Sequence, residues 1–147
     1  MRELRSEITI DADAGTVWDI LTDIRRYPDW NPFITSIEGE LAVGHKLKIR
    51  IEPPDIRPMT FWLTCLERTE RKRLRWLGSL VIKGLFDGEH IFELEALADS
   101  KTHFIQREEF FGVIVPLLWG MVAPNTLRGF QAMNLKLKSR AEERSQV

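Results

Sequence analysis

The chain has little cysteine and no long apolar run, and both absences narrow what it can be. Among 147 residues Cys65 is the only cysteine, so neither an internal disulfide nor a cysteine-built metal site can form. We therefore expect a reducing compartment, the cytoplasm. Residues 1–13 contain no apolar stretch of signal-peptide length. The most apolar segment, residues 112–124, is shorter than the roughly 20 residues that a bilayer requires, and Pro116 interrupts it. No stable membrane insertion is expected.

An excess of charge of either sign is also lacking. The 21 lysines and arginines balance 22 aspartates and glutamates, which gives no electrostatic reason to expect nucleic acid as a partner. The three histidines, His45, His90 and His103, do not have the spacing of metal ligands, so no metal is predicted. Nucleotide-binding glycine loops and the GxSxG motif are absent from the sequence, and no cofactor is predicted. With 44% hydrophobic and 29% charged residues, the composition is that of a globular protein, and we assign residues 1–147 to one domain.

Hydrophobic periodicity predicts an α+β protein built mainly from antiparallel strands. Apolar residues alternate over residues 3–10, which predicts a first strand. Helical spacing then predicts a short helix over 13–22 and a second helical turn at 23–27. Six more strands follow, and the short turns between them predict an antiparallel meander. These strands are expected at residues 33–39, 45–52, 59–69, 72–78, 88–97 and 102–112.

A long helix is predicted to end the chain. It would start at Pro124 or Asn125, where proline and asparagine suit a helix N-terminus. A curved sheet needs an element that fills its concave face, and this helix is the only predicted one of sufficient length. Its inward stripe is predicted to be Leu127, Phe130, Met133, Asn134 and Leu137.

The segment YPDWNPFI, residues 27–34, places aromatic side chains beside two prolines. Each proline disfavours the helical conformation of the residue before it, so a loop is predicted. A loop with such side chains either plugs a core or lines a hollow.

Three segments, residues 14–33, 74–94 and 106–120, carry a resemblance to a known family. They read AGTVWDILTDIRRYPDWNPF, LRWLG…GLFDGEHIFEL and QREEFFGVIVPLLWG. In their order and spacing, over nearly the whole chain, they resemble the START/SRPBCC superfamily, which includes the plant allergens, and in particular its bacterial polyketide cyclase/dehydrase-like branch.

The resemblance implies a helix-grip fold. In this fold a curved seven-stranded antiparallel sheet wraps around a long C-terminal helix, two short helices follow the first strand, and an apolar cavity lies between sheet and helix. Members of the superfamily bind lipids, sterols, polyketides or other hydrophobic molecules, and a minority catalyse cyclisation, dehydration or hydrolysis. The fold therefore does not decide the activity, and no catalytic residue is carried over. In the resembled fold, residues 27–34 join the two short helices to the second strand. The resemblance thus implies that Phe33 lies in the cavity wall and that Tyr27 supports the loop, and both roles stay open for Trp30.

Aromatic side chains supply most of the predicted ligand site. Core packing explains any single one of them, but apolar side chains on loops around one end of a sheet together indicate a pocket. The apolar part of the predicted site is Trp30, Phe33, Trp76, Phe86, Phe92, Phe110, Trp119, Phe130 and Met133.

Polar residues share strand faces with these aromatics. His90 has the same strand parity as Phe92, and Gln106 and Glu108 have that of Phe110. An unpaired buried polar group costs roughly 1–3 kcal/mol, so these three residues either form a structural network or orient a ligand. In the second case they complete the predicted ligand site.

Three functional hypotheses follow. The first is a non-catalytic protein that binds a small hydrophobic molecule. The second is a polyketide cyclase or dehydratase, or a hydrolase, in which Glu108 and His90 act as acid and base. The third is a partner-binding module, including a homodimer, that uses the apolar segment 113–121. That segment is otherwise predicted to be a lid loop over the cavity, and an edge that dips into a membrane to exchange a lipid is the remaining alternative. The basic run at 67–75 is interpreted as a solvated hairpin tip, with an anionic partner as the alternative.

Overall fold

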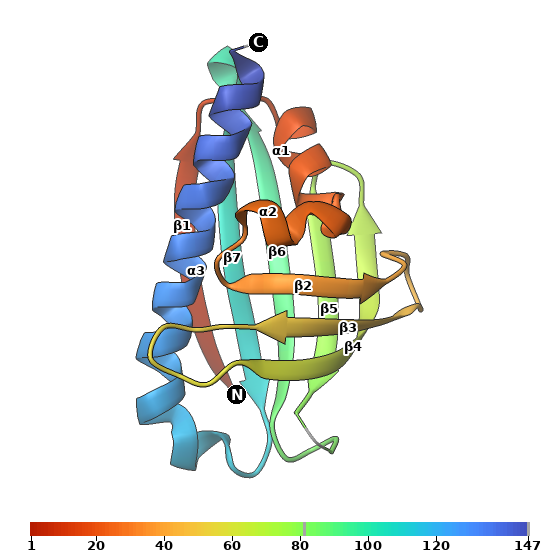
Figure 1. The fold of residues 1–147 in the computed structure, drawn as a ribbon, viewed down its shortest axis with the longest axis vertical. Coiled ribbons are helices and arrows are strands. Elements are labelled where there is room, and N and C mark those ends of the chain that lie inside the picture. The colour runs from red at the N-terminus through yellow and green to blue at the C-terminus, as the bar shows by residue number, and fades with distance from the viewer. Residues whose placement is uncertain (81, 147) are drawn as a thin grey trace.

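The computed structural model describes residues 1–80 and 82–146, in which one antiparallel sheet curves around a long helix (Figure 1). The strand order is β1-β7-β6-β5-β4-β3-β2, so β2 to β7 form a meander and the first strand pairs with the last. This is the predicted α+β helix-grip fold. The strands are β1 (Arg2–Ile10), β2 (Ile34–Gly39), β3 (Lys46–Ile51), β4 (Met59–Thr69), β5 (Arg73–Ser79), β6 (Asp87–Leu97) and β7 (Lys101–Phe111), and the 3-10 turn η2 (Ala98–Ser100) joins β6 to β7.

Short helices separate β1 from β2, as the sequence predicts. Helix α1 (Ala14–Thr22) is capped by Asp13, whose carboxylate accepts a hydrogen bond of 2.8 Å from the backbone N–H of Thr16. The apolar stripe of α1 is buried against the C-terminal part of the last helix and the ends of β6 and β7. A 3-10 turn, η1 (Ile24–Arg26), leads into the next helix.

Residues 27–30 form the short helix α2 (Tyr27–Trp30), so the predicted loop is wrong here. Pro28 lies in the first turn of α2, where its missing N–H removes no helical hydrogen bond. Tyr27 is fully buried and donates its hydroxyl hydrogen to the carbonyl of Leu21. The helix ends at Asn31, whose side-chain oxygen accepts hydrogen bonds from the backbone N–H groups of Phe33 and Ile34 at 3.0 and 2.9 Å.

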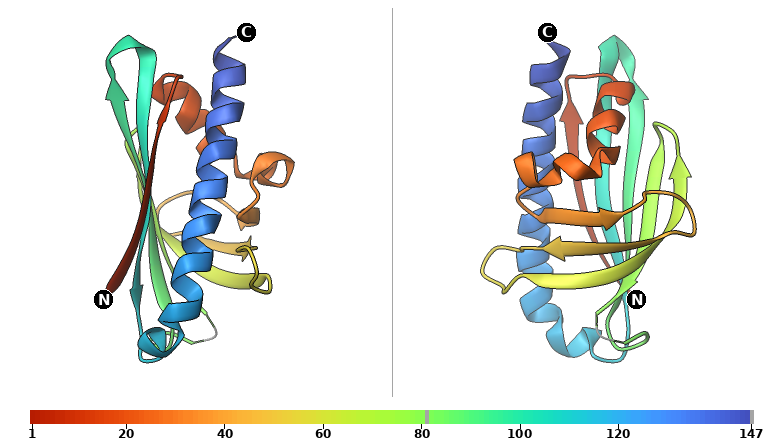
Figure 2. Two further views of the ribbon diagram at one scale, coloured as in Figure 1. Left: turned by 90° about the vertical axis from the view of Figure 1, so that its left-hand side faces the viewer. Right: turned by 45° about the vertical axis from the view of Figure 1, so that its right-hand side comes forward.

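The final helix, α3 (Val115–Ser145), begins well before the predicted start at Pro124. Most of segment 113–121 is therefore helical, and the prediction of a lid loop is wrong. Pro116 falls in the first turn, where proline fits. Pro124 lies inside the helix and is exposed, so its ring meets solvent rather than another element. The first turns of α3 bend away from the axis of the rest, consistent with proline inside a helix (Figures 1 and 2).

Helix α3 crosses the concave face of the sheet (Figure 2). Phe130, Met133, Asn134 and Leu137 of the predicted inward stripe are buried, and Leu127 is half-buried. Helix α3 comes close to Phe33, the residue before β2, at Gly129, where an added Cβ would lie 2.3 Å from Cδ1 of Phe33. A glycine is therefore required where this aromatic ring meets the helix.

The convex face of the sheet carries charged side chains in alternating rows. Arg107 Nε donates to Glu93 at 2.7 Å, and Arg75 pairs with Glu67 at 3.0 Å and with Glu89. Trp62 stands out on this face because 61% of it is exposed. The alternation of β3 to β7 thus separates an apolar inner face from a charged outer one.

Within residues 1–80 and 82–146, no helix is both long and apolar enough to cross a membrane.

Candidate ligand-binding cavity

A cavity of about 100 Å³ lies between the concave face of the sheet and the N-terminal half of α3. Since about 10–15 Å³ on this measure holds one water molecule, the cavity has room for several waters or for part of a small organic molecule. Its wall is mostly apolar. The lining residues are Phe33, Ile34, Ile49, Ile51, Ile56, Met59, Phe61, Leu63, Trp76, Gly78, Leu80, Phe86, Gly88, His90, Glu108, Phe110, Leu118, Met121, Val122 and Thr126.

Two glycines keep the floor of the cavity open. Gly78 on β5 and Gly88 on β6 are paired across the two strands, and both line the cavity. A Cβ at Gly88 would lie 2.3 Å from Oε2 of Glu108, so the Glu108 carboxylate occupies the space that a side chain at position 88 would fill. A Cβ at Gly78 would lie 3.0 Å from the Cβ of Leu63. Because both residues lack a side chain, space remains at this point of the sheet, and the Glu108 carboxylate occupies the part of it above Gly88.

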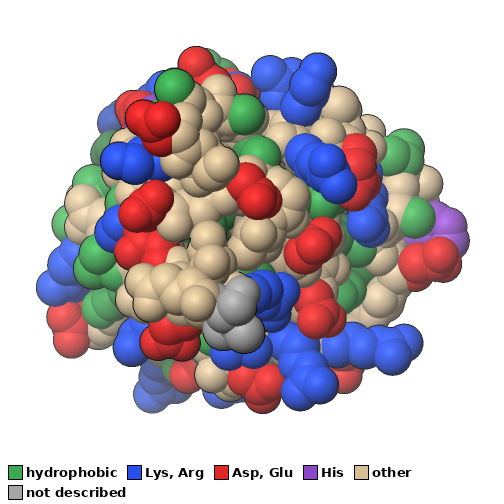
Figure 3. All heavy atoms as spheres, turned by 90° about the horizontal axis from the view of Figure 1, so that it is seen from above, with side chains coloured by type: hydrophobic (Ala, Val, Ile, Leu, Met, Phe, Trp, Pro, Cys, Tyr) green, Lys and Arg blue, Asp and Glu red, His purple; other side chains and the backbone are tan. Residues whose placement is uncertain are grey.

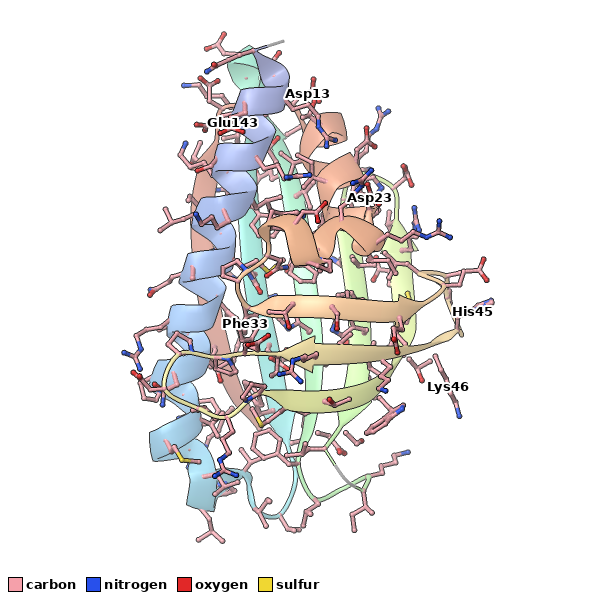
Figure 4. All side chains as sticks on the ribbon, viewed as in Figure 1. Asp13, Asp23, Phe33, His45, Lys46 and Glu143 are labelled. Carbon is pink, nitrogen blue, oxygen red and sulfur yellow. The ribbon has the colours of Figure 1, made fainter. Side chains whose placement is uncertain are left out.

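Phe33 forms the wall between β2 and α3 (Figure 4). Its ring contacts that of Phe130 edge-on, with the ring centroids 5.5 Å apart. At the opposite wall, Phe110 contacts Phe86 and Trp119, with centroid distances of 5.8 and 5.4 Å. Two of these contacts, Phe33–Phe130 and Phe110–Trp119, thus join α3 to the rest of the cavity wall.

A buried chain of polar side chains runs behind the cavity from the sheet to α3. Ser6 accepts from Asn134 Nδ2 at 2.7 Å, Asn134 Oδ1 accepts from Gln106 Nε2 at 2.7 Å, and Gln106 Oε1 lies 3.0 Å from His90 Nε2. All four residues are buried. Because each amide is satisfied, the chain links α3 to β1, β6 and β7 without leaving polar groups unpaired.

His90 connects this chain to the cavity. Its Nδ1 atom lies 3.4 Å from Oε1 of Glu108, whose side chain is largely buried. The imidazole is surrounded by the rings of Phe92, Phe130 and Trp76, with centroid distances of 4.5, 5.1 and 5.8 Å. These rings restrict its movement, so the orientation of His90 toward Glu108 is well defined. The pair can accept a hydrogen bond from a bound molecule or exchange a proton with it.

The structure brings six of the twelve predicted site residues to the cavity, namely Phe33, Trp76, Phe86, His90, Glu108 and Phe110. Six others lie elsewhere. Phe92, Phe130 and Met133 are buried in the core, and Gln106 belongs to the polar chain.

The last two predicted residues lie outside the cavity as well. Trp119 is half-buried and packs between Phe110 and Arg2. Trp30 packs edge-on against Tyr27 at 5.2 Å and does not line the cavity, which answers the question left open for it. The binding of a ligand by any of these residues stays a prediction.

Several lining residues were missed by the sequence reasoning. They are the inward aliphatic side chains of β3 and β4 and those of the first turns of α3, together with the glycine pair. The parity that identifies His90 as inward also assigns Ile49, Ile51 and Leu63 to the inner face, so the same signal would have found them. Gly78 and Gly88 share the strand parity of Trp76 and His90 and therefore also face inward. An inward-facing glycine leaves space that a side chain would otherwise fill, which indicates a cavity at that point of the sheet.

Neither a metal cluster nor a reactive thiol adds to the site. In the part of the chain that the structure describes, no group of three or more His, Cys, Asp or Glu side chains could hold a metal ion. Cys65 is buried on β4, and burial raises the pKa of its thiol, which disfavours the reactive thiolate.

Comparison with known proteins agrees with this architecture. A family model described as "Polyketide cyclase / dehydrase and lipid transport" matches residues 1–142. The Zhui aromatase/cyclase from Streptomyces sp. R1128 superposes with a TM-score of 0.81 at 16% identity, over 97% of this chain and 94% of that chain. A START superfamily protein from Mycobacterium smegmatis gives a TM-score of 0.75 at 18% identity, over 96% and 97% of the two chains.

A point mutant of norcoclaurine synthase from Thalictrum flavum, in complex with a transition-state analogue, gives a TM-score of 0.71 at 12% identity, over 97% and 95% of the chains. At these identities the structural likeness concerns the fold. No curated protein sequence matches the chain.

Proposed function

The chain belongs to the polyketide cyclase/dehydrase and lipid transport family, and from that premise we propose that it binds a small hydrophobic molecule in the cavity between the sheet and α3. The observation that supports this is an apolar wall contributed by β2 to β7 and α3, which encloses space that the core does not fill. Ligand sites are mostly apolar hollows with a few polar groups that orient the ligand. Glu108 and His90 provide such groups here.

The entrance is expected between the first turns of α3 and the β3–β4 loop. Met121 lines the cavity and is also 53% exposed, so it lies where the cavity meets solvent. Ile56 in the β3–β4 loop and Leu118 on α3 line the same region. A ligand larger than about 100 Å³ requires these two segments to separate, since that is the volume present.

Binding should depend on the open space itself. Val122→Phe adds a ring to the wall from α3, and we expect it to weaken binding of the neutral dye N-phenylnaphthylamine at least about tenfold, because overpacked cavities lose the contacts that a ligand would make. Leu135→Phe is the matched control, since Leu135 lies on the same helix and faces solvent. Fluorescence titration measures both. Equal dye binding by the two variants, or no displacement of the dye by a library of apolar compounds, would contradict the proposal.

Native mass spectrometry of the purified protein gives an independent test. A molecule that co-purifies and is lost on organic extraction is the expected result. Its disappearance in Val122→Phe but not in Leu135→Phe would assign it to this cavity.

A second candidate function is catalysis of a cyclisation or dehydration. The observation that favours it is the close pairing of Glu108 and His90 at the cavity wall, because a general acid and base must lie within reach of the bound substrate. Glu108→Gln is then expected to abolish turnover while leaving ligand binding within about threefold, since the amide has nearly the shape of the carboxyl group. Turnover retained in Glu108→Gln would remove this candidate.

A further inference from the structure

Two neighbouring N–H donors at the end of α2 are buried without an acceptor. Among residues 1–80 and 82–146, four buried side-chain atoms have no hydrogen-bond partner, and two of them are Nε1 of Trp30 and Nδ2 of Asn31. Trp30 is 9% exposed and Asn31 is 4% exposed. Polar groups inside proteins are nearly always hydrogen-bonded. Two unpaired donors on consecutive residues therefore indicate a place where an acceptor from outside the chain binds.

The orientation of the Asn31 amide is fixed by the backbone. Its Oδ1 atom accepts hydrogen bonds from the N–H groups of Phe33 and Ile34 at 3.0 and 2.9 Å. Exchanging the amide oxygen and nitrogen would turn an NH₂ group toward two N–H donors and lose both hydrogen bonds. Nδ2 is therefore the unpaired end of the side chain. Since an amide nitrogen only donates, an acceptor is the group that satisfies it.

Trp30 and Asn31 both line a groove of about 450 Å³ between α2 and α3, two helices that lie beside each other (Figure 1). None of the residues that line this groove also lines the cavity between the sheet and α3. The groove is thus a separate feature of the surface. Its lining residues are Pro28, Asp29, Trp30, Asn31 and Pro32 on one side, and Lys136, Ser139, Arg140 and Glu143 of α3 on the other.

The groove has an excess of positive charge. Lys136 and Arg140 are four residues apart on α3 and therefore share one face of the helix. The ion pairs that α3 forms within the described residues involve other side chains, so both cations are unpaired. Asp29 is paired with Arg26 at 3.4 Å. Glu143 is exposed and is the one carboxylate of the groove without an ion pair in the described residues, so two unpaired cations face one unpaired anion.

We propose that the groove between α2 and α3 is a second binding site, separate from the cavity, which takes the carboxylate of a small organic acid. The carboxylate oxygens accept hydrogen bonds from Nε1 of Trp30 and Nδ2 of Asn31. Lys136 and Arg140, whose long side chains turn to admit the ligand, balance its charge, and the guanidinium fork matches a carboxylate in shape. A single negative charge equals the excess of the groove, whereas a doubly charged anion exceeds it and is repelled by Glu143.

Phenylacetate tests the site because it joins one carboxylate to a small apolar body. Phenylacetamide and phenethylammonium are its neutral and cationic counterparts. The readout is the proton–nitrogen correlation spectrum of labelled protein at neutral pH, in which the Trp30 indole and the Asn31 amide give assignable signals. We expect phenylacetate to shift both signals saturably and to bind at least about threefold more tightly than phenylacetamide, since hydrogen bonds to an ionised partner are the stronger ones. Phenethylammonium should leave both signals unmoved.

Arg140→Gln removes one cation of the groove. We expect it to weaken phenylacetate binding about threefold to tenfold, through the loss of a charge-assisted contact. Arg128→Gln is the matched control, because Arg128 lies on the same helix and does not line the groove. It is about 18 Å along the axis from Arg140, beyond the distance over which salt screens charges, so affinity should be unchanged.

Trp30→Phe removes one donor without changing the charge of the groove. It should also weaken phenylacetate binding, by about threefold, as expected for the loss of one hydrogen bond. Circular dichroism establishes that the variant is folded. Should it fail to fold, the comparison of Arg140→Gln with Arg128→Gln decides.

Three results would overturn the proposal. The first is the absence of a saturable shift of the two signals with phenylacetate. The second is equal affinity for the acid and the amide, or equal weakening by Arg140→Gln and Arg128→Gln, since either would show that no carboxylate is recognised. The third is loss of both shifts in Val122→Phe, which would assign them to binding in the cavity. The proposed function is tested separately, by the dye and the apolar compounds, and does not depend on these results.

Discussion

The two halves of α3 use their apolar side chains in opposite ways. In the C-terminal half, Leu137 and Ala141 are fully buried. In the N-terminal half, Leu117 and Met121 are 82% and 53% exposed, and Leu118 and Val122 line the cavity. One helix thus serves as a packed anchor along one half and as a cavity wall along the other. The difference indicates that the stability of the fold and the binding of a ligand depend on separate parts of the same element.

Polar contacts strengthen the anchored end. Glu142 accepts a hydrogen bond of 2.8 Å from the backbone N–H of Asp11 and pairs with Lys138, whose ammonium lowers the pKa of Glu142. Lys138 also donates to the carbonyl of Thr9 at 3.3 Å. Viewed from this end, the surface shows acidic and basic side chains intermixed (Figure 3). The surface of this end is thus charged, in contrast to the exposed leucine and methionine at the other end.

Leu137→Ala, in the packed half of α3, is expected to cause the largest loss of stability. Truncating a fully buried leucine is expected to lower the free energy of unfolding by about 2–5 kcal/mol, through lost burial and the cavity left behind. Chemical denaturation measures the change. Leu118→Ala is the counterpart in the other half and should cost less, because its side chain already borders open space. Equal losses in the two variants would remove the distinction between anchor and wall.

Gln106→Leu tests the polar chain that joins the two regions. The substitution leaves the Nε2 atom of His90 and the side chain of Asn134 without their buried partner, and we expect a loss of about 1–3 kcal/mol in the free energy of unfolding. Adding Asn134→Leu removes one of the stranded groups, so the double variant should be more stable than the sum of the two single losses predicts. Strict additivity in urea denaturation would mean that the chain is not a coupled network.

Asp13→Ala tests the cap of α1 at the anchored end. The expected loss is about 1 kcal/mol at neutral pH, the usual effect of removing an N-cap. Hydrogen bonds from Thr16 lower the pKa of Asp13 in the folded protein. Its contribution is therefore complete above the unfolded value of about 3.9 and is lost as the pH falls through the lower folded pKa. The stability difference between wild type and variant should vanish in strong acid, and a constant difference would contradict the capping role.

The sheet was predictable because each strand carries its own evidence. Alternation places His90, Phe92 and Leu94 on one face of β6, and turn residues separate β6 from its neighbours. The start of α3 was not predictable in this way. Pro116, Gly120 and Pro124 each suggest an irregular backbone, and local propensity disfavours a helix there. In the structure Pro116 lies in the first helical turn, where proline fits, and at Pro124 the helix bends but continues.

The site was predictable only in part, for a related reason. Strand parity correctly places His90 and Glu108 on the inner face, and that face borders the cavity where Gly78 and Gly88 leave space. Strand parity does not indicate whether an inward-facing position borders the cavity or the packed core. Phe92 and Gln106 have the right parity and are paired across β6 and β7, but they lie beyond the cavity. Phe92 packs against the ring of Phe104, and Gln106 donates a hydrogen bond to Asn134 of α3. Which inward-facing positions α3 covers depends on its path over the sheet, which is a tertiary property.

Leu117→Ser has the smallest expected effect and tests whether the open end of α3 is exposed in solution. With 82% of Leu117 exposed, the free energy of unfolding should change by less than about 0.5 kcal/mol. Leu135→Ser, at another exposed position of the same helix, is the control. Denaturation at several protein concentrations and sedimentation velocity measure the outcome. A loss above about 1 kcal/mol that grows with protein concentration, and that Leu135→Ser lacks, would indicate that a second copy covers Leu117. In that case the homodimer considered from the sequence would replace the open end, and the entrance to the cavity would have to lie elsewhere.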